Sequence, residues 1–149
     1  MNRQVLKDFV AALKNPAWIC FLWLGLTVGI SFVAVPEIFT ASSVARPQAL
    51  DAASVVFAAL NRAELGALVI LLVTIRFSGR ANILWTFASA LALIVLAQSI
   101  WLLPELTERS QQIVAGIEPA ASNAHAIYAS LEIAKVLLLI TLGFRTLSK

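Results

Sequence analysis

The stretch HAIYASLEIAKVLLLITLGF, residues 125–144, is twenty residues long and mostly apolar. At a rise of about 1.5 Å per residue, a helix of about 20 residues crosses the roughly 30 Å hydrocarbon core of a bilayer. Three more apolar stretches of similar length precede it, at residues 17–35, 53–75 and 81–103. Backbone groups inside lipid must be satisfied internally, so each stretch is predicted to be a helix. The sequence therefore predicts an all-α integral membrane protein with one four-transmembrane-helix bundle over residues 1–149.

The composition of the whole chain agrees with this class. Hydrophobic residues make up 60% of the 149 residues and charged residues only 13%, with a mean hydropathy of +0.90. These values lie far outside the balance of a soluble domain. The net charge of +3 comes from basic residues that lie mostly at the ends of the apolar stretches, where they set orientation. We therefore expect the lipid bilayer as the main partner and no nucleic acid.

The distribution of basic residues predicts the orientation. Seven of them lie near the two termini and in the connection between the second and third stretches: Arg3, Lys7, Lys14, Arg76, Arg80, Arg145 and Lys149. The other two connections hold only Arg46 and Arg109. By the positive-inside rule, both termini are predicted to be cytoplasmic in a multi-pass protein of the inner (plasma) membrane.

Small residues in the first stretch indicate a close helix contact. Gly25 and Gly29 are four residues apart, and this spacing lets two helix backbones approach in a membrane. They are expected either to face another helix of the bundle or to face lipid. In a homo-oligomer they would form the contact between copies.

Two segments of the chain resemble each other without gaps. Residues 57–64 read FAALNRAE and residues 128–135 read YASLEIAK. Each segment also follows a span that ends in a Pro-Glu pair, at residues 36–37 and 104–105. The pattern predicts two pseudo-repeated helical hairpins of the same topology, related by an axis along the membrane normal.

Four charged residues lie within the apolar stretches: Arg62, Glu64, Glu132 and Lys135. A charged side chain near the bilayer centre costs about 3 kcal/mol on insertion scales, so such residues face the interior, pair, or serve a function. The alignment of the two segments places Glu64 at the depth of Lys135. One interpretation is structural, with Glu64 pairing with Lys135 and Arg62 with Glu132 to fix which helices are neighbours.

The other interpretation is a pocket that binds a small molecule or ion or relays protons. Residues 125, 128, 132 and 135 follow a spacing that places them on one helix face. The candidate ligand-binding or proton-relay residues are Asn61, Arg62, Glu64, Gln98, His125, Tyr128, Glu132 and Lys135. All lie in the outer half of the spans, whereas the inner half is almost purely apolar. This distribution predicts a pocket that opens to the outside and is sealed toward the cytoplasm.

The sequence identifies no catalytic residue and leaves any cofactor unknown. A haem held by two histidines needs a second histidine, and the chain has only His125. Its single Cys and single Met disfavour a tight soft-metal site within one chain, although His125 and Glu132 could share a metal across a dimer. There is no phosphate loop, nucleophile elbow or metalloprotease helix. These absences argue against hydrolases and nucleotide-driven enzymes.

The chain resembles the bacterial four-span membrane proteins grouped as a domain of unknown function, which are similar to the transmembrane-protein-205 type. The residues that carry this resemblance are Pro36, Phe39, residues 57–64, Leu103, Pro104, Arg109, and the run His125-x-x-Tyr128-x-x-x-Glu132-x-x-Lys135. The resemblance implies a four-helix membrane fold of unassigned biochemical role. In size and span count alone the chain also resembles the four-helix protoporphyrinogen oxidase type, but it lacks a histidine in the first span.

Three functions are therefore compared with the structure below. The leading hypothesis is a non-enzymatic membrane protein that binds a small molecule or ion and is related to transport. The first alternative is a redox protein that handles a haem or metal through His125. The second alternative is a structural or assembly subunit whose charges only set helix register.

Overall fold

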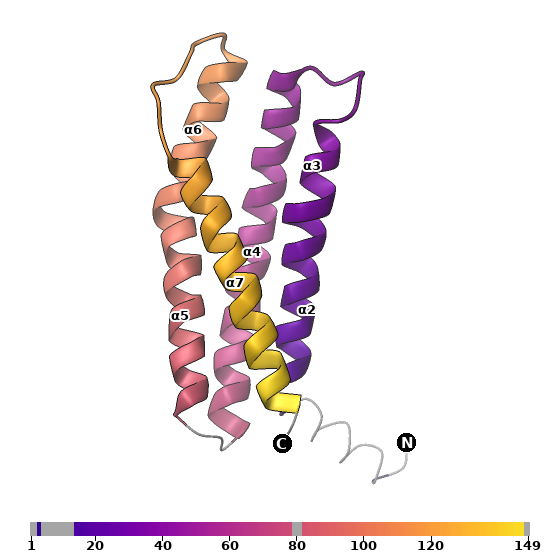
Figure 1. Cartoon of the computed structure of the whole chain (residues 1–149), viewed down its shortest axis with the longest axis vertical. Helices are drawn as coiled ribbons and strands as arrows, with labels where there is room; N and C mark the ends of the chain where they lie inside the picture. Colours follow the sequence, from indigo (N-terminus) through magenta and orange to yellow (C-terminus); the bar gives the residue numbers. More distant parts are fainter. Residues whose placement is uncertain (1–2, 4–13, 79–81, 148–149) are drawn as a thin grey trace.

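The structure is a computed structural model that describes residues 3, 14–78 and 82–147. All regular secondary structure in these residues is helical, and four spans run alternately up and down the bundle (Figure 1). In chain order the elements are α2 (Ala17–Thr27), the π-helix η1 (Val28–Ala34), α3 (Val35–Ile38), α4 (Arg46–Ser78), α5 (Ile83–Ala97), the π-helix η2 (Gln98–Leu102), α6 (Leu103–Val114) and α7 (Ala124–Leu147).

The prediction of an all-α, multi-pass membrane protein is confirmed. The continuous helices Ala17–Ile38, Arg46–Ser78, Ile83–Val114 and Ala124–Leu147 are each long and apolar enough to cross a membrane. Helix α2 begins and α7 ends at the same end of the bundle, here called the terminal end. The opposite end holds the connections 39–45 and 115–123 and is called the loop end. The predicted start of the third span at Ala81, and the basic residues Lys7, Arg80 and Lys149, lie outside the described residues.

Two spans contain a π-helical segment directly before a proline. Pro36 follows η1 and Pro104 follows η2, each within the first two residues of the next α-helix. A proline inside a helix lacks its N–H donor and clashes with the carbonyl four residues earlier. A wider π-helical turn before the proline is one way in which a helix can accommodate this clash and the missing hydrogen bond. The same feature occurs at corresponding places in both hairpins, as the predicted repeat requires.

Contacts between equivalent residues also agree with the repeat. Phe57 and Tyr128 are equivalent in the alignment, and their rings meet edge to face with centroids 5.4 Å apart. Glu64 and Lys135 are also equivalent, and they form an ion pair at 2.6 Å. Residues related by a two-fold axis contact each other only when they lie close to that axis. Both contacts are those that a pseudo-two-fold axis between α4 and α7 would produce, and the repeat itself stays a prediction.

The fourth span is shorter than its neighbours at the loop end. Figure 1 shows α4 and α6 continuing above the first turn of α7. The start of α7 is held against α6, because the Ser122 hydroxyl donates to Glu105 at 2.5 Å and accepts from the Ala124 amide at 3.1 Å. Arg109 donates to the carbonyl of Ala120 at 2.5 Å in the same connection. The outermost turns of α4 and α6 at the loop end are consequently not covered by α7 (Figure 1).

The terminal half has a closely packed apolar core. Trp23, Leu71, Leu91 and Leu139, one from each span, are all fully buried there. Helix α2 crosses α7 closely at Gly143, where an added Cβ would lie 2.9 Å from a ring atom of Phe21. A smaller apolar cluster at the loop end consists of Leu102, Leu103, Ala124 and Tyr128.

Gly25 and Gly29 do not pack against another helix of the chain. Both are exposed, and an added Cβ at either position would meet no atom within 4 Å. Within the described residues the pair is therefore on the outer surface of the first span. The predicted contact between copies of the protein stays a prediction.

Candidate functional site

Three charged side chains meet inside the bundle, and we call them the buried triad: Glu64, Glu132 and Lys135. Helix α4 supplies Glu64, and α7 supplies the other two from adjacent turns. The Lys135 ammonium lies 2.6 Å and 2.7 Å from the two Glu64 oxygens and 2.7 Å from Oε1 of Glu132. Their exposed fractions are 0%, 2% and 0%, so the charges are removed from both water and lipid.

The Glu64 carboxylate is fully satisfied by its neighbours. Besides the lysine, the Trp23 indole nitrogen donates to Oε1 at 3.0 Å and the Thr27 hydroxyl donates at 2.9 Å. Trp23 and Thr27 are one helical turn apart on α2 and both have 0% exposure. Glu64 is therefore held by hydrogen bonds from α2 on one side and by the ammonium group of α7 on the other.

Glu132 has a different environment although it contacts the same lysine. Its Oε1 accepts from Lys135 and, at 2.8 Å, from Nε2 of Gln98, while Gln98 Oε1 accepts from Lys135 at 2.9 Å. Its Oε2 is buried and has no hydrogen-bond partner among the described residues. Buried polar atoms without a partner are rare because each costs the full desolvation penalty of the group.

The predicted repeat relates Oε2 of Glu132 to a second unpartnered atom, the hydroxyl oxygen of Ser31. Asn61 and Ser99 form a hydrogen-bonded pair at 2.9 Å between the second and third spans. In the alignment Glu132 is equivalent to Asn61, and Ser31 is equivalent to Ser99, since each serine lies five residues before the proline of its π-helical span. The Ser31 hydroxyl is the other buried side-chain atom without a hydrogen bond in the described part of the chain. By the alignment these two residues correspond to the Asn61–Ser99 pair, but neither Glu132 Oε2 nor the Ser31 hydroxyl has a hydrogen bond to the described residues.

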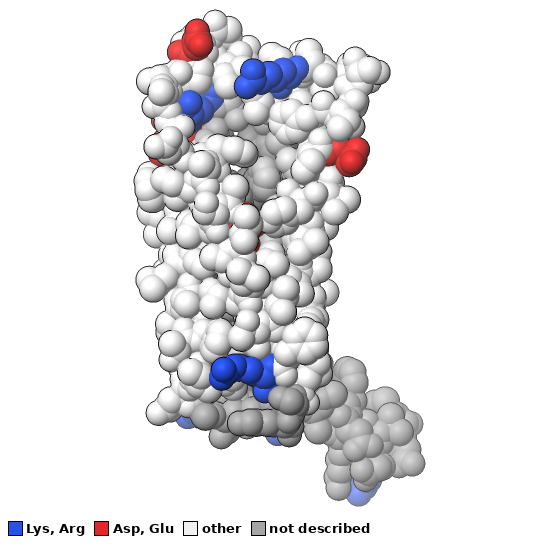
Figure 2. Space-filling view, in the orientation of Figure 1, with Lys and Arg blue, Asp and Glu red and all other residues white. Residues whose placement is uncertain are grey.

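A cavity of about 500 Å³ lies between the spans at the loop end, beside the first turn of α7; we call it the vestibule. Its lining residues are Val35, Pro36, Phe39, Arg46, Leu50, Ala53, Ser54, Phe57, Leu103, Leu106, Thr107, Ser110 and His125. Figure 2 shows the surface hollowed in the upper half of this face.

Two aromatic rings separate the vestibule from the buried triad. Phe57 lines the vestibule, and Tyr128 packs edge-on against it. Tyr128 is buried and lies one turn before Glu132 on the same helix face. The predicted single pocket, open to the outside and containing all the charges, is therefore divided into an open apolar vestibule and a closed charged site.

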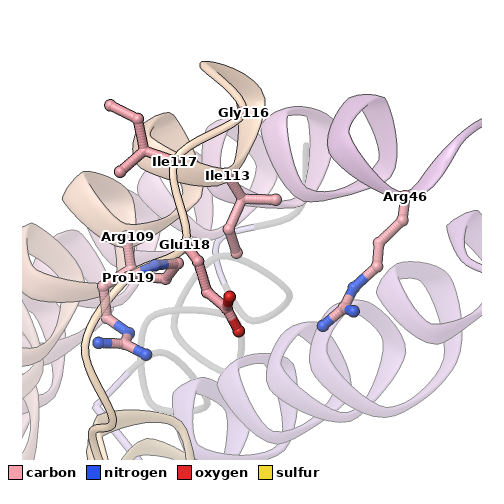
Figure 3. A pocket seen from close by; sticks show the side chains of 7 residues that line it. All are labelled: Arg46, Arg109, Ile113, Gly116, Ile117, Glu118 and Pro119. Carbon is pink, nitrogen blue, oxygen red and sulfur yellow. The ribbon is translucent and has the colours of Figure 1, made fainter.

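A second depression lies beside the vestibule and shares Arg46 with it. Arg109, Ile113, Gly116, Ile117, Glu118 and Pro119 complete its lining. Figure 3 shows the Glu118 carboxylate between the guanidinium groups of Arg46 and Arg109. No ion pair forms between Glu118 and either arginine, and Arg46 makes no side-chain hydrogen bond to the described residues.

The structure brings only part of the predicted site together. Glu64, Gln98, Glu132 and Lys135 form the buried cluster, with Tyr128 next to it, and the predicted pair of Glu64 with Lys135 is confirmed. His125 is exposed and lines the vestibule. Asn61 is buried, but its amide is bonded to Ser99 instead of the triad.

The predicted pairing of Arg62 with Glu132 is wrong. Arg62 is exposed and lines a shallow surface depression that also contains Glu108, while Glu132 pairs with Lys135. The reason is helical geometry, because residues two positions apart differ by about 200° around an α-helix. Since Glu64 faces the interior, Arg62 must face outward. The buried site therefore holds two carboxyl groups and one ammonium group.

Sequence reasoning misses Trp23 and Thr27, the two α2 donors to Glu64. A signal exists: the residues are four apart in the first span, and Trp23 lies in the middle of the span instead of at the membrane interface where tryptophans collect. Thr27 gives little signal, since threonine hydroxyls in helices can also bond to their own backbone. No group of three His, Cys, Asp or Glu side chains lies together in residues 14–78 and 82–147.

Comparison with known proteins gives a family but no function. A profile of a family described as domain of unknown function (DUF4149) matches residues 18–115, which is more than half of the chain. No curated protein and no solved structure matches it. The matched residues include Trp23, Thr27, Glu64 and Gln98 of the buried cluster, and α7 lies beyond them.

Proposed function

The chain belongs to the DUF4149 family, and we propose that it is a transport-related protein of the inner (plasma) membrane whose buried triad binds and releases a proton. In this proposal Glu132 carries the proton on Oε2. Glu64 stays ionised and holds Lys135 in place.

The observation that carries the proposal is the imbalance of the site. Two carboxyl groups share one ammonium group at 0–2% exposure, so the fully ionised site has one excess negative charge in a low-dielectric interior. Such a charge is costly in a membrane unless it is paired or neutralised. One proton on Glu132 neutralises the site while Oε1 keeps both of its hydrogen bonds. The unpartnered Oε2 is the free position for that proton.

The surroundings of Glu132 offer a route for exchange with the loop end. Ser31 lies one turn toward the loop end from Thr27, and Glu132 lies one turn toward the loop end from Lys135. A water between Ser31 and Glu132 would satisfy both unpartnered atoms and receive the proton from Oε2. The Phe57 and Tyr128 rings separate this position from the vestibule, so exchange requires their displacement.

The structural alternative is favoured by one observation and applies to one part of the site. Glu64 has four donor contacts and no unsatisfied oxygen, as expected of an ion pair that fixes helix neighbours. We therefore assign a structural role to Glu64 and Lys135 and exchange to Glu132. The redox alternative has weaker support, because His125 is exposed in the vestibule and is separated from the triad by Tyr128.

Three further expectations belong to this proposal. The positive-inside rule favours a cytoplasmic terminal end, because Lys14, Arg76 and Arg145 lie there, and hence an outward-facing vestibule. The resemblance to the transmembrane-protein-205 type extends into α7 through the run from His125 to Lys135. The exposed Gly25 and Gly29 offer an open helix face for a homo-oligomer.

The proposal is tested by counting the protons that the purified protein takes up across the neutral pH range, where exposed carboxyl groups are already ionised. The wild type should take up one more proton per chain than Glu132→Gln. Exposed Glu37→Gln is the matched control and should behave as the wild type, because its carboxylate lies outside the bundle interior. Equal uptake by the wild type and Glu132→Gln would refute the proposal.

A further inference from the structure

We propose that the vestibule binds one amphiphilic molecule with a single hydrocarbon chain and an anionic carboxylate or phosphate head. This site is distinct from the buried triad, and the inference does not depend on proton exchange by Glu132. It rests on the shape, the apolar lining and the charge of the vestibule.

The shape of the vestibule follows from the missing turns of the fourth span. Three helices form its walls, the start of α7 closes one side, and Phe57 forms part of its inner surface. Arg46 and Phe57 are eleven residues apart on α4, so the cavity extends about 16 Å along that helix. Its volume of about 500 Å³ lies within the usual range of pockets for small organic ligands. An elongated cavity suits a chain better than a compact polar solute.

Much of the lining of the vestibule is apolar. Val35, Phe39, Leu50, Phe57, Leu103 and Leu106 contribute to its lining. An apolar cavity that faces the membrane surface gains free energy when a hydrocarbon chain replaces water in it. Ser54, Thr107 and Ser110 add hydroxyl groups among these side chains, but none of them carries a charge.

The charged groups of the vestibule select the sign of the head. Arg46 and His125 line it, and none of the thirteen lining residues is acidic. The nearby carboxylates are directed elsewhere: Glu37 accepts from Thr40, and Glu105 accepts from Trp101 and Ser122. Arg46 has no ion pair with the described residues, so its guanidinium is available to a ligand. A planar guanidinium is well suited to a carboxylate or phosphate head.

Glu118 is the group that would compete with the ligand for Arg46. Its carboxylate lies between Arg46 and Arg109 in the adjacent depression without forming an ion pair to either (Figure 3). An anionic head at Arg46 would be repelled by this carboxylate and attracted by the two arginines. Removing the Glu118 charge should therefore strengthen binding, whereas removing the Arg46 charge should weaken it. A neutral amphiphile should respond to neither change.

The experiment measures binding of laurate, a carboxylate with a saturated hydrocarbon chain, to the full chain in nanodiscs of zwitterionic lipid. Isothermal titration calorimetry with subtraction of empty nanodiscs separates saturable binding from partition into lipid. Dodecanol, which has the same chain and no charge, is the ligand control. Arg76→Gln is the matched protein control, because Arg76 is an exposed arginine on the same helix at the terminal end.

Wild-type protein and Arg76→Gln should bind one laurate per chain with the same affinity and bind dodecanol at least tenfold more weakly. Arg46→Gln should weaken laurate binding at least tenfold, and Glu118→Gln should strengthen it severalfold. Ser54→Phe, which fills the vestibule wall, should abolish saturable binding while the thermal midpoint stays close to that of the wild type. No saturable binding by the wild type, or equal affinities of the wild type and Arg46→Gln, would overturn the inference.

A further variant separates this site from the triad. Glu132→Gln should bind laurate as the wild type does, whatever its effect on proton uptake. If Glu132→Gln takes up as many protons as the wild type but Arg46→Gln still loses laurate, the proton proposal fails and the vestibule site stands. If the wild type does not bind laurate but Glu132→Gln takes up one proton fewer than the wild type, the vestibule site fails and the proton proposal stands.

Discussion

The two halves of the bundle are built from the same spans but differ in how much of α7 they contain. In the terminal half four helices surround a dry core with fully buried Leu71, Leu91 and Leu139. In the loop half only the first turns of α7 are present, and they border a cavity of about 500 Å³. The buried triad lies where the two regions meet. The comparison shows that the charged site lies between a large apolar core on one side and, on the other, a smaller apolar cluster that contains the Phe57 and Tyr128 rings.

The same contrast appears within the triad itself. Glu64 faces α2 and receives donors from Trp23, Thr27 and Lys135, whereas Glu132 lies nearer the vestibule and keeps one oxygen without a partner. Two carboxyl groups that share one ammonium group therefore have different roles. The following variants test this difference, from the largest expected effect to the smallest.

Replacing Lys135 by Met should cause the largest loss of stability. It leaves two buried carboxyl groups without their cation, and breaking a buried pair from one side costs about 3–5 kcal/mol. Arg62→Met is the control, because Arg62 is exposed on the opposite side of α4. Reversible unfolding in mixed detergent micelles measures both variants. A loss for Lys135→Met no larger than that for Arg62→Met would contradict the central role of the lysine.

Truncating a leucine should distinguish the two halves. Leu139→Ala in the terminal half creates a cavity in a fully packed core, with an expected loss of about 2–5 kcal/mol. Leu106→Ala in the vestibule wall only enlarges an existing cavity, so its loss should be about 1 kcal/mol or less. The same unfolding measurement gives both values. Equal losses would show that the loop half is packed as tightly as the terminal half.

Neutralising the two carboxyl groups should have unequal effects. Glu64→Gln replaces a carboxylate oxygen that accepts hydrogen bonds with an amide NH₂ that faces donors, and we expect a loss of about 1–3 kcal/mol. Glu132→Gln keeps an oxygen for Lys135 and Gln98 and mimics the shape of a protonated carboxyl group. Its loss should therefore be about 1 kcal/mol or less. A larger loss of stability for Glu132→Gln than for Glu64→Gln would assign the ionised, structural role to Glu132.

The fold and one half of the site follow from the sequence. Apolar length defines the four spans, and the alignment of residues 57–64 with 128–135 places Glu64 at the depth of Lys135, with which it pairs in the structure. The observed second span, Arg46–Ser78, is longer than the predicted 53–75, because the helix continues beyond the apolar stretch at the loop end. Apolarity reports the membrane-buried part of a helix and does not report where the helix ends.

The rest of the site depends on which side of its helix each side chain lies and on where each helix ends. Composition specifies neither. Depth along the span groups Arg62 with the buried charges, although its position two residues before Glu64 turns it outward. Thr27 is hard to recognise because a threonine in a span has a backbone acceptor of its own. The vestibule is not predictable as a separate cavity, since it exists only because α7 begins lower than α4 and α6.

The most direct test of the central claim is infrared difference spectroscopy of the carbonyl stretch that only a protonated carboxyl group has. At neutral pH we expect this band in the wild-type protein and in Glu64→Gln, and we expect its loss in Glu132→Gln. A wild-type protein without the band, or a band that persists in Glu132→Gln, would show that Glu132 does not carry the proton.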